Sequence, residues 1–289
     1  MKIIITGKTG LIGSAIFNNL INNNHQIISI GRNNCDYYAD LNNLNIDISN
    51  LSGDVFIHCA GVTDEEIKIN RGQAILRNTI GLINLVDFSM KIGISKFIYV
   101  SSAHVYGSLN QLINEQSNTE PKSIYGVLHL FAEKYIKTVF KNFLFLRPGA
   151  VYGETPSEFN RWELIPFSFP RDLAINEKII IRSHGKQWRN FISSNTIAEI
   201  IIECIEKSIS GVINPVGFYS MSVSGFAKFC IKTINKRKTN NSMLNIELLG
   251  QGDYENKFKY ISTLDLPKED ENLLKDHIYN LYKKIYEKN

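Results

Sequence analysis

The chain has 289 residues, of which 44% are hydrophobic, and this is enough to bury a large core in one large domain or in two lobes. The formal net charge of +4 is small for this length, and no run of lysines and arginines stands out, so nucleic acid is not an expected partner. No apolar stretch approaches the roughly 20 residues of a membrane helix and no secretory signal is recognisable, so we expect a soluble, cytoplasmic protein.

The first half of the chain alternates short apolar runs with helix-like segments. Continuous runs rich in Ile, Val and Phe are typical of parallel strands that are covered on both faces. This alternation predicts an α/β fold with a doubly wound parallel sheet. The strand-like runs cover residues 2–6, 26–30, 54–60, 96–102 and 143–149, and the helical stretches lie near 13–24, 65–92 and 123–141.

The pattern changes after about residue 150, where three prolines fall within a short span. We predict a smaller, less regular C-terminal lobe over residues 151–289, from which residues 193–215 return a helix and a strand to the sheet. The elements expected here are strands at 178–182 and 188–192, a helix at 195–208, a strand and turn at 211–217, and helices at 223–237 and 269–287.

The first predicted turn, "TGKTGLIG", carries Gly7, Gly10 and Gly13. It directly follows a predicted strand and opens a predicted helix, which is the context that the dinucleotide fingerprint requires. In that motif Gly7 permits the tight turn, Gly10 lets the backbone approach a pyrophosphate, and Gly13 lets the helix pack close to the sheet. The helix N-terminus also favours phosphate. We therefore predict a dinucleotide-binding domain over residues 1–150, although glycines also serve ordinary strand–turn–helix units.

The second predicted strand ends at "SIGRNN", where an acidic residue would accept hydrogen bonds from the adenosine ribose of NAD. This chain has Arg32 instead. A guanidinium suits a 2′-phosphate, which favours NADP over NAD, although a single arginine at this place can also be a surface residue. Asp40 can reach the adenine amino group, and Asp47 is the competing candidate.

Seven motifs in chain order resemble those of the extended short-chain dehydrogenase/reductases that act on nucleotide sugars, the NAD-dependent epimerase/dehydratase type. They are "TGKTGLIG", "DVFIHCAG", "NTIGLINLVDFSMKIGISKFIYVSSAHVYG", "YGVLHLFAEKYI", "LRPGAVYG", "KQWRNFISSNTIAEII" and "GVINPVGFYSMSV". Their common order is far more specific than any one of them. The resemblance implies a Rossmann-type sheet that binds NAD(P) and a smaller C-terminal lobe that binds a nucleotide-sugar substrate.

The resemblance also implies which residues form the site. The expected catalytic residues are Ser102, Tyr125 and His129. The expected cofactor contacts are Gly7, Gly10, Leu11, Ile12, Gly13, Arg32, Asp40, Leu41, Cys59, Ala60, Gly61, Asn78, Tyr125 and His129. The expected substrate contacts are Ser102, Ala103, His104 and Arg189, of which the arginine matches one that often contacts the substrate diphosphate.

In this family a lysine follows the catalytic tyrosine by four residues, lowers its pKa and hydrogen-bonds the nicotinamide ribose. Here His129 occupies that position. An imidazole can still bond the ribose, but its ordinary pKa of about 6.5 leaves it mostly neutral at pH 7. Three interpretations stay open. The first is that Tyr125 is less activated, which impairs a reductase least because the tyrosine then acts as an acid. The second is that the enzyme recruits another group. The third is that the chain binds cofactor without competent chemistry.

The residues after Ser102 narrow the reaction. In the dehydratase branch they tend to be acidic, whereas here they are Ala103 and His104, which argues against a 4,6-dehydratase. A reductase of a nucleotide-linked 4-keto sugar in surface polysaccharide biosynthesis is the first hypothesis, and Arg32 favours it through NADPH. The alternatives are an epimerase of the same substrates and a non-catalytic dinucleotide-binding protein. Arg161 and Trp162 are weaker candidates for substrate contacts.

The remaining expectations concern metals and partners. The cysteines contain no C-x-x-C pair, so no metal site is expected, and we interpret them as reduced residues of the core. Family members often form homodimers through two helices, which lie here near 78–91 and 125–141. By that analogy we expect a homodimer. The four cysteines are Cys35, Cys59, Cys204 and Cys230.

Overall fold

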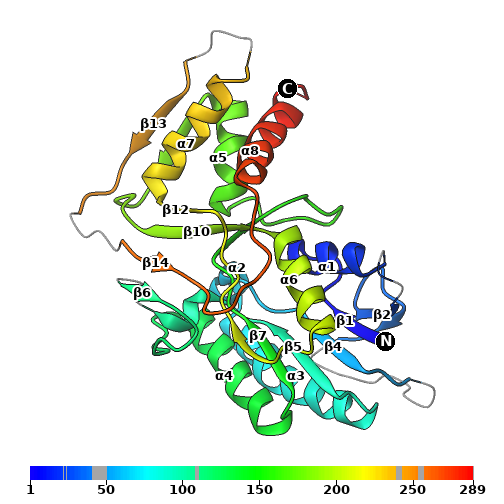
Figure 1. Ribbon diagram of the computed structural model, residues 1–289. Helices are drawn as coiled ribbons and strands as arrows, with labels where there is room; N and C mark the ends of the chain where they lie inside the picture. The colour runs from blue at the N-terminus through cyan, green and yellow to red at the C-terminus, as the bar shows by residue number, and fades with distance from the viewer. Residues whose placement is uncertain are drawn as a thin grey trace.

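A parallel sheet of seven strands forms the core of the N-terminal lobe in the computed structural model (Figure 1). The strand order is β11-β7-β5-β4-β1-β2-β3, which confirms the predicted doubly wound parallel sheet. The structure describes residues 1–21, 23, 25–40, 51–107, 111–238, 243–252 and 257–288. The strands of this sheet are β1 (Lys2–Thr6), β2 (Gln26–Gly31), β3 (Tyr37–Tyr38), β4 (Val55–His58), β5 (Lys96–Val100), β7 (Phe143–Leu146) and β11 (Gly211–Ile213).

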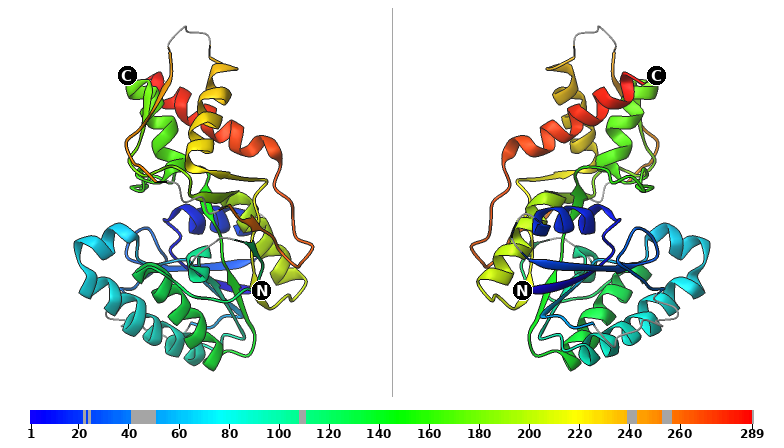
Figure 2. Two further views of the ribbon diagram at one scale, coloured as in Figure 1. Left: turned by 90° about the vertical axis from the view of Figure 1, so that its left-hand side faces the viewer. Right: turned by 90° about the vertical axis from the view of Figure 1, so that its right-hand side faces the viewer.

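Helices cover both faces of this sheet, as the two side views show (Figure 2). Successive residues of a strand point to opposite faces, so Ile3 and Ile5 of β1 belong to a core formed with α1 and α6. Ile4 belongs to the opposite core, formed with α3 and α4. The helices of this lobe are α1 (Leu11–Ile21), α2 (Asp64–Ile69), α3 (Arg71–Lys91), α4 (Ile124–Val139) and α6 (Ser194–Glu206).

The helix expected over residues 65–92 is in fact two helices. Thr63 caps α2, because its hydroxyl accepts from the Glu66 amide and the Glu66 carboxylate accepts from the Thr63 amide. Asn70 then ends α2, and its side chain caps α3 by accepting from the Gln73 amide at 3.2 Å. Asn favours such cap positions over helix interiors, and this explains the break.

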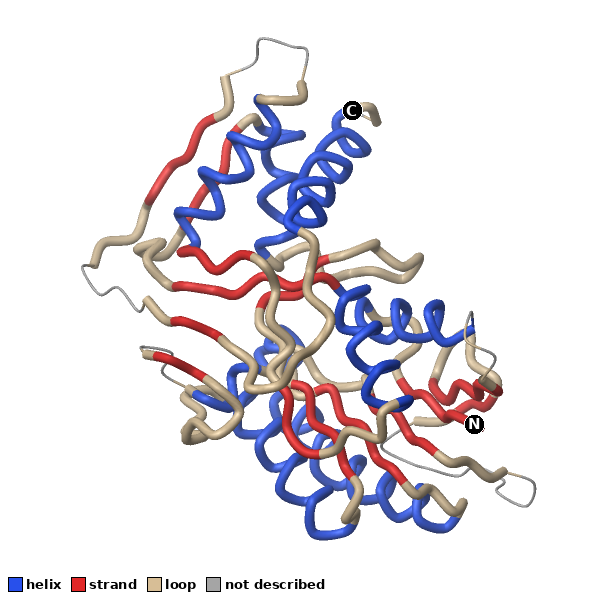
Figure 3. The backbone as a smooth tube through the Cα atoms, viewed as in Figure 1, coloured by secondary structure: helices blue, strands red, loops and turns tan. Residues whose placement is uncertain are grey.

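The described part of the C-terminal lobe combines three helices with short strands. Figure 3 draws the helices in blue and the strands in red. A three-stranded sheet of order β12-β10-β8 lies between these helices and the N-terminal lobe. Within the described ranges, no helix is long and apolar enough to cross a bilayer. The elements that belong neither to the large sheet nor to the helices that cover it are η1 (Ala103–Tyr106), β6 (Leu112–Ile113), β8 (Ala150–Tyr152), α5 (Ile165–Asn176), β9 (Lys178–Ile181), β10 (Trp188–Ser193), β12 (Tyr219–Ser222), α7 (Val223–Asn235), β13 (Asn245–Leu248), β14 (Lys259–Tyr260) and α8 (Glu271–Tyr286).

Helix α5 falls in the proline-containing span after residue 150, for which the sequence predicts no helix. It starts with Pro166 near its N-terminus and contains Pro170 in its interior. A proline has no N–H to donate, so Pro170 leaves the carbonyl of Pro166 without its helical partner. The Nε2 of His277, on α8, lies 2.9 Å from that carbonyl oxygen and replaces the missing bond. Tertiary packing therefore sustains a helix that local propensity disfavours.

A buried ion pair fixes α4 against the ends of two strands. Glu133 of α4 accepts from Arg147, just after β7, through Nε at 2.9 Å and Nη2 at 2.6 Å. The Ser101 hydroxyl, just after β5, donates to the same carboxylate at 2.6 Å. Both charged side chains are nearly inaccessible to water. Removal of one partner would leave the other charge buried and unpaired, so this pair is costly to break and joins α4 to the ends of β5 and β7.

Candidate active site

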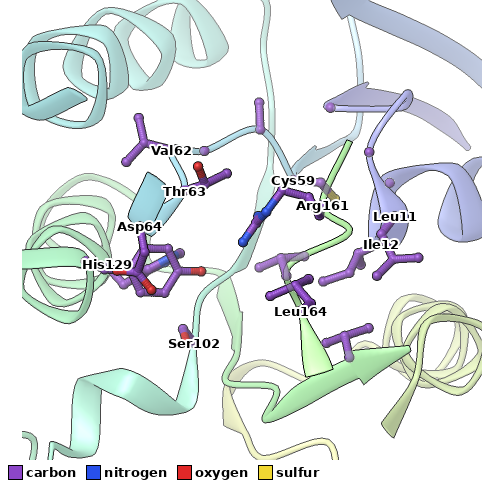
Figure 4. Close-up of a pocket in the computed structure, with 18 of the residues that line it drawn as sticks. Leu11, Ile12, Cys59, Val62, Thr63, Asp64, Ser102, His129, Arg161 and Leu164 are labelled. Carbon is purple, nitrogen blue, oxygen red and sulfur yellow. The ribbon is translucent and has the colours of Figure 1, made fainter. Parts of the chain in front are cut away.

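A cavity of about 1160 Å³ lies between the two lobes, at the carboxyl ends of the parallel strands. Ligands of open α/β sheets bind at this edge, because the loops that leave the strands converge there. Figure 4 shows the residues on its walls: Asp64, Ser102 and His129 lie on one side, Leu11 and Ile12 on the other, and the Arg161 side chain extends between them.

The glycine turn after β1 forms one wall, and two of its glycines are required by the fold itself. Gly7 has φ of +76°, and a Cβ there would lie 2.6 Å from the Ala60 amide nitrogen. A Cβ on Gly13 would lie 2.0 Å from the Gly7 carbonyl oxygen. Gly10 differs, since a Cβ there would approach nothing closer than 3.3 Å. Gly10 lines the cavity, and its missing side chain leaves the backbone there open to a ligand.

The end of β2 holds the residues expected at the adenosine. Arg32 and Asp40 both line the cavity. Leu41 and Asp47 lie outside the described residues. Sequence reasoning missed Glu158 of the other lobe, whose carboxylate accepts from the side chains of Asn34 at 2.7 Å and Asn33 at 3.4 Å. The two walls of the cavity are therefore joined at this end.

The loop after β4 forms another part of the cavity wall. Cys59, Ala60 and Gly61 line the cavity, as expected for the loop beside the nucleotide. Asn78 does not line it, and its side chain instead donates to the Ala74 carbonyl of its own helix at 3.0 Å. The neighbouring Arg77 does line the cavity.

Ser102, just after the end of β5, and Tyr125, at the start of α4, both line the cavity. Ser102 caps η1, and its hydroxyl oxygen accepts from the His104 amide at 3.2 Å. Gly126 lets α4 approach η1 closely, because a Cβ there would lie 2.6 Å from the His104 carbonyl oxygen. Burial raises the pKa of Tyr125, whereas the charge of Arg161 and a hydrogen bond from Ser102 act against that rise.

His129 lies one turn after Tyr125, with ring centroids 4.5 Å apart, and it lines the same cavity. Burial lowers the pKa of His129 to about 3, and the like charges of His104 and His58 act in the same direction. The imidazole is therefore neutral at pH 7. Its Nδ1 lies 2.7 Å from the hydroxyl oxygen of Tyr99, on β5. No motif signals this contact, because it joins a strand interior to a helix.

The residues expected to contact the substrate line the remaining wall. Ala103 and His104 line the cavity, and the His104 ring lies 5.4 Å from that of Tyr125, edge to face. Burial lowers the pKa of His104, and the charge of Arg189 contributes to the lowering. Arg189 lines the cavity too, and its Nη1 donates to the Trp188 carbonyl at 2.7 Å.

Asp64 is an acidic residue of the site that sequence reasoning missed. It is the first residue of α2 and lines the cavity. Its negative charge adds to the rise in the pKa of Tyr125 and partly opposes the lowering of the pKa of His104. The available signal was its position three residues after Gly61, at the carboxyl edge of the sheet. Ser102, Tyr125, His129, His104 and Asp64 thus line the same cavity.

Comparison with known proteins defines the class of protein. Residues 3–217 match the model of the NAD dependent epimerase/dehydratase family, and the chain belongs to that family. This confirms the resemblance to extended short-chain dehydrogenase/reductases.

Several known proteins are similar in sequence to most of this chain. The dTDP-D-glucose 4,6-dehydratase of Homo sapiens is 27% identical over 274 residues, which are 84% of this chain and 77% of that protein. A putative UDP-glucose 4-epimerase of Methanocaldococcus jannaschii is 29% identical over 217 residues, 68% of this chain and 71% of that protein. The spore coat polysaccharide biosynthesis protein SpsK of Bacillus subtilis is 23% identical over 230 residues, 79% and 75% of the two chains.

Solved structures share the fold over nearly the whole chain. A UDP-N-acetylglucosamine 4-epimerase from Methanobrevibacter ruminantium superposes with a TM-score of 0.78 at 21% identity, covering 100% of this chain and 99% of that chain. MoeE5, solved with UDP-glucose and NAD, gives 0.79 at 18% identity and covers all of both chains. A dTDP-4-dehydrorhamnose reductase from Clostridium acetobutylicum gives 0.75 at 18% identity and covers 99% of each. At these identities the likeness shows the fold alone.

Proposed function

We propose that this protein is an NAD(P)H-dependent reductase of a nucleotide-linked 4-keto sugar. The observation that carries the proposal is Tyr125 beside the neutral imidazole of His129 in the cavity. Burial raises the pKa of Tyr125 above its ordinary value of about 10, so the phenol is protonated at neutral pH. A protonated phenol can donate a proton to a carbonyl oxygen, and reduction of a keto sugar requires this step.

The roles of the side chains follow from their positions. The dinucleotide, when bound, supplies a hydride to the carbonyl carbon. Tyr125 donates its proton to the carbonyl oxygen, which takes the electron pair of the broken π bond and becomes a hydroxyl. When the substrate is bound, the Ser102 hydroxyl turns its one proton from Tyr125 to the carbonyl oxygen and so holds that oxygen beside the phenol. Arg189 offers a guanidinium to the substrate diphosphate.

The cofactor is proposed to lie along the wall formed by the glycine turn, Arg32, Asp40 and the loop after β4. We propose that residues 1–150, with 193–215, bind it and that most of residues 151–289 bind the sugar nucleotide. The open space beside Gly10 fits a pyrophosphate. Arg32 supports NADP. NAD is the alternative, because MoeE5, which shares the fold, was solved in complex with NAD.

Two other functions remain candidates. An epimerase would use the same Ser102 and Tyr125, and solved epimerases share this fold. A non-catalytic dinucleotide-binding protein is the third candidate, because His129 replaces the family's lysine. Ala103 and His104, where the dehydratase branch tends to have acidic residues, argue against a 4,6-dehydratase.

The cellular role and assembly belong to the same proposal. The likeness to SpsK supports a role in surface polysaccharide biosynthesis, and such a role suits a cytoplasmic enzyme. We propose a homodimer formed through α3 and α4, because Leu76, Ile80 and Val127 on these helices are each about half exposed. The molar mass in solution, measured by light scattering, tests the dimer.

The experiment that tests the function follows the absorbance of NADPH in the presence of UDP- or dTDP-linked 4-keto sugars. Consumption of NADPH with formation of the 4-hydroxy sugar supports the reductase. Conversion of the sugar without net cofactor oxidation supports the epimerase. Tight binding of NADPH without any conversion supports the non-catalytic protein, and absence of binding to either pyridine nucleotide would refute all three.

A further inference from the structure

Tyr99 lies directly behind the proposed catalytic helix but outside the cavity. It is 3% exposed, and its ring lies between those of His58, at 5.6 Å, and His129, at 5.7 Å. Its hydroxyl oxygen is 2.7 Å from Nδ1 of His129. His129 lines the cavity and Tyr99 does not. A buried phenol therefore contacts one nitrogen of an imidazole whose ring borders the ligand space.

The direction of this hydrogen bond follows from proton counting. A phenol carries one proton, and burial raises the pKa of Tyr99 well above its ordinary value, so the proton stays. Within the described part of the chain, Nδ1 of His129 is the hydrogen-bond partner found for this hydroxyl. If Nδ1 carried a proton instead, the phenol proton would have no acceptor. Tyr99 therefore donates, and Nδ1 accepts.

The acceptor state of Nδ1 fixes the other nitrogen. A neutral imidazole has one donor and one acceptor, so Nε2 carries the hydrogen. We propose that Tyr99 is a positioning residue that locks His129 in the Nε2–H tautomer and so presents a fixed, uncharged donor to the cavity. The identity of the acceptor rests on the proposed function: this N–H donates to a ribose hydroxyl oxygen of the nicotinamide nucleotide.

The groups around His129 agree with this assignment. His58 hydrogen-bonds Thr6 through its own Nδ1 at 2.6 Å, so its contact with Tyr99 is by ring stacking. The carboxylate of Glu133 is bound by Arg147 and Ser101. Tyr125 and His104 face the cavity side, as does Asp64. Tyr99 is the partner found for His129 on the sheet side.

The tautomer can be measured without any ligand. In protein labelled with ¹⁵N-histidine, we expect His129 to show an unprotonated Nδ1 and a protonated Nε2 near neutral pH. Tyr99→Phe should convert this signature to a mixture of both tautomers. Tyr135→Phe, which removes a hydroxyl from the same helix as His129, should leave it unchanged. A protonated Nδ1 in the natural protein, or an unchanged signature in Tyr99→Phe, would overturn the proposal.

A second measurement tests the consequence for binding. We expect Tyr99→Phe to weaken NADPH binding in proportion to the share of the Nε2–H tautomer that is lost, by about twofold for an equal mixture of the two tautomers. His129→Gln carries an amide donor that needs no tautomer lock. In that background, Tyr99→Phe should have little further effect, because the two positions are coupled. Equal losses in both backgrounds would refute the coupling. The ligand-free signature tests the lock even if no keto sugar is a substrate.

Discussion

At the scale of single residues, the imidazole of His129 changes what Tyr125 can do. A lysine cation next to a phenol stabilises the phenolate, whereas a neutral imidazole supplies only a hydrogen bond. Burial and the nearby histidines together lower the pKa of His129 to about 3, so the imidazole gains no charge at physiological pH. Tyr125 is therefore suited to donate a proton and poorly suited to remove one.

Replacement of Tyr125 tests its role as the acid. Tyr125→Phe removes the donated proton and should lower kcat for keto-sugar reduction by about 10²- to 10⁴-fold. NADPH binding should change little, because the ring and its packing remain. Steady-state kinetics and calorimetry measure the two quantities. Tyr135→Phe serves as the control, and a kcat for Tyr125→Phe close to that of the control would exclude Tyr125 as the proton donor.

Replacement of His129 by lysine should shift the pH profile. In reduction Tyr125 must be protonated, so activity is lost as the pH rises through its pKa. The natural protein should therefore keep its activity to about pH 10, since burial raises that pKa. In His129→Lys the cation lowers the pKa of Tyr125, so the loss should begin at lower pH while turnover at pH 7 rises. Identical profiles for both proteins would show that position 129 does not influence Tyr125.

The residues of the cavity wall that sequence reasoning named rest on two kinds of signal. Gly7 and Gly13 follow from the spacing of the turn, whereas Tyr125 and His129 follow from the family resemblance of the motif that contains them. Tyr99 and Glu158 carry no such signal. Each depends on how close two distant segments come, and that distance is decided by packing of the whole core.

At the scale of elements, α5 shows a helix whose stability depends on its neighbour. Neither Pro166 nor Pro170 predicts a helix, and local sequence gives no hint that His277, more than a hundred residues later, meets the freed carbonyl. By contrast, α1, α4, α6, α7, α8 and the strands of the sheet lie close to the predicted ranges, apart from the two-residue β3, which was not predicted. Their apolar periodicity is local, and for that reason it could be predicted.

The contact between α8 and α5 has a measurable energy. His277→Ala leaves the Pro166 carbonyl buried without a donor and should lower the free energy of unfolding by about 1–3 kcal/mol. His277→Gln keeps an N–H donor and should recover part of the loss. Urea denaturation measures both variants, with His25→Ala, on the loop before β2, as the control. No difference between His277→Ala and the control would remove the carbonyl contact as a source of stability.

At the scale of the whole molecule, three histidines, of which His58 and His129 are buried and His277 is partly buried, make the fold sensitive to acid. Burial lowers the pKa of His58 to about 3, of His129 to about 3 and of His277 to about 4. In the unfolded chain each has a pKa of about 6.5. The unfolded state therefore binds more protons at every pH between these values. Stability is highest above about pH 6.5 and falls as the pH is lowered toward 4.

Denaturation at several pH values tests this linkage. Each histidine contributes a slope of at most about 1.4 kcal/mol per pH unit, so three give about 4 kcal/mol per unit below pH 6. The free energy of unfolding should be nearly constant from pH 7 to 8 and should fall steeply from pH 6 to 5. His277→Gln should reduce that slope by about a third. A flat profile down to pH 5 would contradict the assignment of neutral histidines.

Glu158 accepts hydrogen bonds from the side chains of Asn33 and Asn34, and this bridge between the two lobes affects how fast a ligand can enter and leave the cavity. We expect these hydrogen bonds to slow the exit of a molecule held at that end of the cavity, because they join its two walls. We therefore expect Glu158→Ala to shorten the residence time of a bound dinucleotide more than it weakens equilibrium binding, as stopped-flow displacement would measure. An unchanged dissociation rate would mean that the bridge is no barrier to exit. With the bridge intact, the turnover of this protein would depend in part on how often a pair of loops separates.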